Sequence, residues 1–77
     1  MILGTYEHWK KKRRYYAFMF FTLDDTLTGR REAMVLYYAM DAEGSGVEGC
    51  TVERFTSMVA DGVPRFRLIE EGKNEKG

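Results

Sequence analysis

Two apolar patterns at opposite ends of the chain indicate β-strands. An aromatic-rich run without glycine or proline covers residues 15–23, and this composition predicts a strand buried on one face and partly covered on the other. In residues 65–69 apolar side chains alternate with arginines, which predicts a final strand. Residues 1–9 are typical of a short extended segment. The chain is therefore expected to be mainly β.

The central segment, residues 32–40, fits two periods equally well. Its alanine, leucine and methionines suit a helix, whereas its valine and tyrosines suit a strand. A period of two puts Met34, Leu36, Tyr38 and Met40 on one face, and helical spacing puts Ala33, Leu36, Tyr37 and Met40 together. The pattern alone leaves both alternatives open.

Residues 51–59 predict a short helix or 3-10 turn. Thr51 has the side chain of an N-cap, and helical spacing gathers Val52, Phe55, Met58 and Val59 on one side. Polar residues and glycines, which favour turns, separate the predicted elements at 24–29, 41–49 and 61–62. We therefore expect one domain over residues 1–69, followed by a polar, flexible tail over residues 70–77.

Length and composition add oligomerisation to this picture. A 77-residue chain has a thin core, since a domain of this size buries only about 60% of the surface that its unfolded chain exposes. The 14% of aromatic residues supply much buried area, and association with a second copy is another route to stability. A homo-oligomer is therefore expected.

Charge and cysteine usage bear on partners and compartment. The net charge is zero, but residues 1–31 carry +4 and residues 32–77 carry −4, so no overall attraction to nucleic acid is expected. A lone cysteine, Cys50, forms no internal disulfide, and the cations at residues 10–14 follow too soon for a signal peptide. No run of residues is long and apolar enough to span a membrane. A cytoplasmic location is expected.

Several short motifs occur in the order typical of one bacterial family. Gly4-x-Tyr6-x-His8, the segment 34–37, Phe55 and the segment 61–66 resemble the short bacterial proteins grouped as domain of unknown function 1653. The similarity covers about residues 4–69. It implies a small, open barrel of four to five antiparallel strands, similar to Src-homology-3 (SH3) domains. It also implies that residues 32–40 form a strand, paired with residues 15–23.

The chain also departs from this family. Members typically carry a tryptophan and then an Arg-Pro pair before Phe55, where this chain has Glu48, Cys50 and Thr51. A ligand site built from those family residues would be partly lost here. The family has no established activity, so the resemblance implies architecture rather than function.

The candidate ligand-binding residues are Tyr6, His8 and Arg65. Arg65 is a candidate to bind an anionic group beside His8, since both lie in family-like segments; a structural role for each is the alternative. With a single histidine and a single cysteine far apart in sequence, the chain offers no recognisable catalytic set. It also lacks the paired ligand spacing of a metal site, and no cofactor is expected.

Five consecutive cations, Lys10, Lys11, Lys12, Arg13 and Arg14, precede the aromatic run. Cations that neutralise phosphates, next to aromatic rings that stack on bases, are typical of nucleic-acid binding. The same run would also serve as a solvated turn that keeps a hydrophobic strand soluble. The leading expectation is a non-enzymatic binding or assembly module that self-associates through a strand edge or the aromatic face of residues 15–21. A nucleic-acid-binding accessory protein is the alternative.

Overall fold

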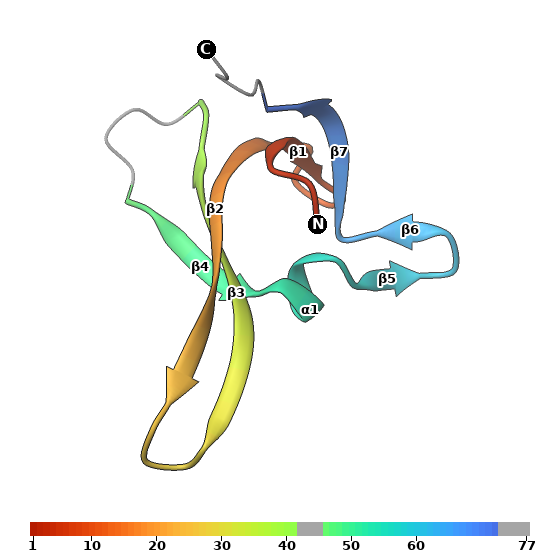
Figure 1. The fold of residues 1–77 in the computed structure, drawn as a ribbon. Helices are drawn as coiled ribbons and strands as arrows, with labels where there is room; N and C mark the ends of the chain where they lie inside the picture. The colour runs from red at the N-terminus through yellow and green to blue at the C-terminus, as the bar shows by residue number, and fades with distance from the viewer. Residues whose placement is uncertain (42–45, 73–77) are drawn as a thin grey trace.

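The computed structural model describes residues 1–41 and 46–72, and most of these residues lie in β-strands (Figure 1). The elements are β1 (Gly4–His8), β2 (Arg14–Asp25), β3 (Arg30–Ala39), β4 (Glu48–Thr51), α1 (Val52–Phe55), β5 (Met58–Ala60), β6 (Val63–Pro64) and β7 (Phe66–Glu71). The expectation of a mainly β protein is confirmed.

Five strands form one antiparallel sheet in the order β4-β3-β2-β1-β7, and β5 pairs with β6 in a separate two-stranded ribbon. The ribbon extends to one side of the sheet (Figure 1). The five described strands curve but do not close into a barrel. The predicted number of antiparallel strands is thus found in an open sheet.

The central segment is a strand, so the helical alternative for residues 32–40 is wrong. It pairs with β2 over ten positions, from Tyr15↔Ala39 to Asp25↔Arg30. The buried face of β3 carries Val35, Tyr37 and Ala39. Leu36 and Tyr38, which belong to the larger apolar residues that a period of two places together, lie on the opposite face of β3.

The helix is shorter than the periodicity predicts. Thr51 is the N-cap and accepts a hydrogen bond from the Arg54 N–H at 3.1 Å. After one turn the chain leaves the helix, and the Thr56 and Ser57 side chains there donate hydrogen bonds to the carbonyls of Val52 and Arg54. Residues 58 and 59, predicted to be helical, instead belong to β5.

Two further boundaries differ from expectation. Strand β4 begins at Glu48, inside the segment predicted to be a loop, and residues 42–45 of that loop lie outside the described residues. Strand β7 continues through Glu71, which pairs with Gly4. The start of the expected tail is therefore strand, and residues 73–77 lie outside the described residues.

The core is an aromatic cluster centred on Phe55, which is fully buried. The Phe55 ring stacks on Phe66 at 4.1 Å between centroids. It also meets Tyr6 edge-on at 4.9 Å and Tyr37 at 5.4 Å. Since these rings come from α1, β7, β1 and β3, the one-turn helix holds together strands that are distant in sequence.

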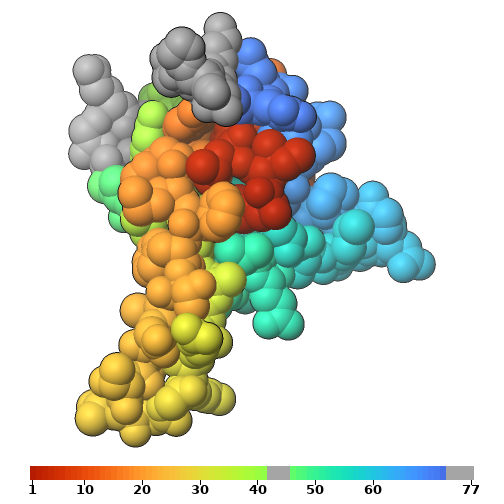
Figure 2. Space-filling view, viewed as in Figure 1, coloured from red at the N-terminus to blue at the C-terminus, as the bar shows by residue number. Residues whose placement is uncertain are grey.

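Beyond the body of the sheet, β2 and β3 continue as a two-stranded arm (residues 18–33). Strand β1 pairs with β2 only over residues 14–17, and β4 pairs with β3 only over residues 34–37. The space-filling view shows the arm standing clear of the rest of the molecule (Figure 2). The arm therefore exposes side chains that the body does not cover.

Candidate functional site

His8 and Arg65, two of the predicted ligand-binding residues, line the same cavity of about 160 Å³. They meet because β1 pairs with β7 in a register that sets His8 opposite Phe66, the residue after Arg65. The Trp9 N–H also donates to the Arg65 carbonyl at 3.0 Å. The remaining lining residues are Lys11, Tyr15, Tyr37, Glu48, Cys50, Arg54 and Phe66.

The turn after β1 holds the imidazole of His8 in one orientation. Its Nδ1 accepts hydrogen bonds from the backbone N–H groups of Lys10 at 3.2 Å and Lys11 at 3.3 Å. Its ring packs edge-on against Phe66 at 5.1 Å. Burial lowers the pKa of His8, and the charges of Lys11, Arg65 and Lys10 lower it further. At neutral pH the ring is therefore uncharged, with its proton on Nε2.

Arg65 is fixed through its backbone and its side chain. Its N–H donates to the Ser57 carbonyl at 2.9 Å, and its Nε donates to Ser57 Oγ at 3.2 Å. Ser57 Oγ in turn donates to the Arg54 carbonyl at 2.6 Å. The end of α1 and the start of β7 are thus tied together, which sets two arginines beside the same cavity.

Tyr6, the third predicted ligand-binding residue, is not among the residues that line this cavity. Its side chain is buried in the core against Phe55, and its hydroxyl donates to the Ile2 carbonyl. Burial raises its pKa, partly offset by that hydrogen bond. These contacts give Tyr6 a structural role.

The basic run divides among several neighbourhoods. Lys11 lines the cavity with His8, whereas Lys12 lines a second depression beside Trp9 and Pro64. Arg13 pairs with Asp41 at 2.9 Å and lies 5.8 Å over the ring of Tyr15. Lys10 and Arg14 are exposed. Tyr15 was predicted to be available for base stacking, but it is buried in the core. The first aromatic ring after the basic run is therefore not exposed.

Of the predicted ligand-binding residues only His8 and Arg65 line the cavity, and the lining residues that sequence reasoning missed include Arg54, Glu48 and Cys50. Glu48 and Cys50 stand at positions where the chain departs from the family pattern, and that departure was the available signal. Thr51, the third such position, caps α1 instead. No motif in the sequence marked Arg54 as a lining residue, because only its position on the one-turn helix brings it to the cavity.

The thiol of Cys50 provides a test of this cavity. Burial raises its pKa, although the nearby Tyr37 hydroxyl and the arginine charges oppose the shift. Since the thiolate is the reactive form, iodoacetamide is expected to modify Cys50 slowly at pH 7.5. The pH midpoint of the reaction should lie above that of the same chain in denaturant, measured by mass spectrometry. A midpoint at or below the denatured value would contradict the partly buried position of Cys50.

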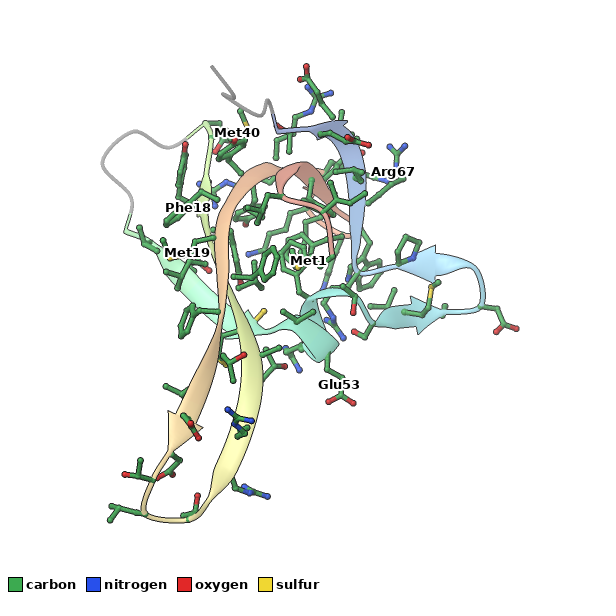
Figure 3. All side chains as sticks on the ribbon, viewed as in Figure 1. Met1, Phe18, Met19, Met40, Glu53 and Arg67 are labelled. Atoms are coloured by element: carbon green, nitrogen blue, oxygen red, sulfur yellow. The ribbon has the colours of Figure 1, made fainter. Side chains whose placement is uncertain are left out.

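The second candidate surface lies on the outer face of β2 and β3, on the side away from the core. Figure 3 shows Phe18 and Met19 on the side of β2 that faces away from β1 and β7. The expected aromatic face of residues 15–21 included Tyr15, but Tyr15 faces the core and is not part of this surface. The residues of the outer face are Tyr16, Phe18, Met19, Phe21, Leu23, Met34, Leu36 and Tyr38.

Two further searches concern metal ions and membranes. Within residues 1–41 and 46–72, no group of three or more His, Cys, Asp or Glu residues is arranged to hold a metal ion. In the same part of the chain, no helix has the length and apolar character needed to cross a membrane.

The family-like motifs lie close together in space. Tyr6 and His8 of the first motif pair with Leu68 and Phe66 of β7, and Phe66 is the last residue of the last motif. Phe55 stacks on Phe66 between them. Comparisons with protein-family models, curated proteins and solved structures found no match to this chain, so the resemblance to domain of unknown function 1653 rests on these motif residues alone.

Proposed function

We propose that the protein is a non-catalytic binding module that self-associates by pairing the free edge of β2 in the arm with the same edge of a second copy. One observation carries this proposal: along residues 18–25, β2 has β3 on one side and no partner strand among the described residues on the other. An unpaired strand edge offers a row of backbone donors and acceptors to another chain.

The composition of this edge favours pairing. Edge strands are commonly protected by lysine, proline or inward-pointing charge. Residues 19–23 contain neither charge nor proline, and the acids Asp24 and Asp25 stand only at the end of the strand. The bulge between Ala17 and Met19 is a further protective feature, and it lies at the start of the free edge, outside residues 19–23.

A twofold arrangement makes this edge self-complementary. Directly opposed residues of an antiparallel pair point to the same side of the sheet. A twofold axis at Phe21 therefore sets Phe21 against Phe21 of the second copy, and Met19 against its Leu23. All three residues belong to the outer face, so the two outer faces would form one continuous apolar surface.

The exposed apolar side chains and the net charge are compatible with a second copy of the chain as the partner of the free β2 edge. Met19, Phe20, Phe21, Leu23 and Tyr38 are 38–51% exposed, which leaves on the order of 400–500 Å² at roughly 200 Å² per large side chain. Pairing of the two edges covers only the part of this area that lies beside the new strand and adds backbone hydrogen bonds, so the contact is smaller than a standard interface. Because the net charge is zero, two copies do not repel each other overall.

Analytical ultracentrifugation over a wide concentration range tests the proposal. The wild-type protein is expected to shift from monomer to dimer as concentration rises. Phe21→Lys should leave it monomeric, because two lysines would face each other across the twofold axis. Leu27→Lys is the matched control: Leu27 lies at the tip of the same hairpin and is 94% exposed, so its dimer should persist.

A wild-type protein that stays monomeric at the highest concentration reached would refute self-association. Equal loss of the dimer in both variants would refute the β2 edge as the contact. If oligonucleotides rather than a second copy bound to the protein at low salt, the nucleic-acid alternative would replace this proposal.

The same proposal extends to fold family and compartment. We assign the protein to the SH3-like open barrels, supported by five antiparallel strands in one curved sheet and by the family-like motifs. Its single, unpaired cysteine supports a reducing, cytoplasmic environment.

A further inference from the structure

The cavity beside His8 concentrates positive charge. Lys11, Arg54 and Arg65 reach it from the β1–β2 turn, from α1 and from the residue before β7. In the described part of the chain, none of the three forms an ion pair, since the acids that do pair there are Glu7, Asp24 and Asp41. Converging like charges repel one another, so an anion in the cavity would relieve the repulsion.

Uncharged hydrogen-bond donors complete the site. With Nδ1 accepting from two backbone N–H groups, the proton of neutral His8 is on Nε2 and is available as a donor. Tyr37 lines the same cavity. Burial raises the pKa of its hydroxyl, and Cys50 and Glu48 raise it further. It therefore stays protonated and can donate. Hydrogen bonds from such groups to an oxyanion are stronger than neutral ones.

The size of the cavity and the acidic lining residue Glu48 restrict the ligand. About 160 Å³ is below the roughly 300–1,000 Å³ of sites that hold drug-sized molecules. Glu48 lines the cavity as well, which disfavours a high negative charge. A small ligand with a single oxyanion group fits both restrictions.

We propose that the cavity lined by His8, Lys11, Arg54 and Arg65 binds a small oxyanion, either a carboxylate or a phosphate group. Arg54 and Arg65 hold the oxyanion from the side of α1, and Lys11 and His8 bind it from the side of the β1–β2 turn. Glu48 limits its charge and accepts a hydrogen bond from any donor attached to it. This site is independent of the free edge of β2 and of self-association.

NMR titration of the full chain with inorganic phosphate, and separately with acetate, tests the proposal. Saturable shifts are expected at His8, Arg54 and Arg65. Saturation by phosphate alone identifies a phosphate site, whereas saturation by acetate identifies a carboxylate site, and either outcome supports an oxyanion. Absence of saturation by both probes would overturn the proposal.

Four variants make the test specific. Arg65→Gln and Lys11→Gln should each weaken binding about tenfold, because each removes a charge-assisted hydrogen bond. Glu48→Gln should strengthen binding about fivefold, since it removes a like charge. Lys10→Gln is the control, because Lys10 is not among the lining residues, and its affinity should match the wild type.

The Lys11 variant keeps the test valid if loss of the Arg65–Ser57 contact destabilises the fold. Lys11 is exposed, and its side chain forms no hydrogen bond with the described residues, so the variant should fold. The proposal would be overturned if Lys10→Gln and Lys11→Gln weakened anion binding equally, because binding would then depend on overall charge alone. It would also be overturned if Glu48→Gln did not strengthen binding.

Discussion

Gly4→Ala is expected to remove a large part of the protein's stability. The backbone of Gly4 has φ of 151°, which residues with a side chain rarely adopt. A Cβ at this position would lie 2.4 Å from the Glu70 carbonyl oxygen and 2.6 Å from the Gly72 nitrogen. Both are backbone atoms, so rotation of a side chain cannot relieve the overlap.

The magnitude follows from what must move. To make room, β1 and β7 must separate where Gly4 pairs with Glu71 and Thr5 with Glu70. We expect a loss of more than about 4 kcal/mol, the range of exceptional single substitutions. A chain of this length has a total free energy of unfolding of only about 4–11 kcal/mol.

Thermal unfolding followed by circular dichroism measures this effect. Gly46→Ala is the matched control, because a Cβ there meets no atom of the described residues within 4 Å, and we expect it to change stability by less than about 0.5 kcal/mol. A Gly4→Ala protein that melts within a few degrees of the wild type would show that β1 and β7 do not approach as closely as described.

Local sequence pattern predicted the strands whose two faces differ clearly. The aromatic run at residues 15–23 became β2, and the alternation at 65–69 became most of β7. The strand assignment is confirmed in both, but the predicted burial of residues 15–23 is wrong beyond Phe18, because β2 is exposed from Met19 onward. Thr51 was also recognisable as an N-cap, because capping depends on neighbouring residues alone.

Pattern failed where burial depends on distant neighbours. On β3 the core face carries Ala39 opposite Tyr15, and Tyr37 opposite Ala17, so each tyrosine packs across from a small residue. Apolar character alone favoured the other face, which carries Met34, Leu36 and Tyr38 and is only partly buried. Helical spacing at residues 51–59 likewise could not reveal that the helix ends after one turn, where the Ser57 hydroxyl donates to the Arg54 carbonyl.

The candidate site was predictable only in part. His8 and Arg65 were linked through family-like motifs, and the β1–β7 pairing brings them to one cavity. Arg54 and Lys11 could not be joined to them, since the cavity gathers residues from four separate segments. Tyr6 shared a motif with His8 but sits two residues earlier on β1, where its ring contacts Phe55 in the core.

Phe55→Ala is the second substitution with a large expected effect. Phe55 is fully buried, and its ring contacts three other aromatic rings, of which Phe66 is nearest at 4.1 Å. Truncation of a buried phenylalanine typically costs about 3–5 kcal/mol, through lost apolar burial and the cavity left behind. One-turn α1 has little stability of its own, so its position depends on this side chain.

Chemical denaturation measures the loss. Leu27→Ala is the control for a large-to-small change, since Leu27 is 94% exposed at the tip of the arm and should change the free energy of unfolding by less than about 0.5 kcal/mol. Phe55→Leu should fall between the two, because it keeps most of the apolar volume. If Phe55→Ala lost no more stability than Leu27→Ala, Phe55 could not be the centre of the core.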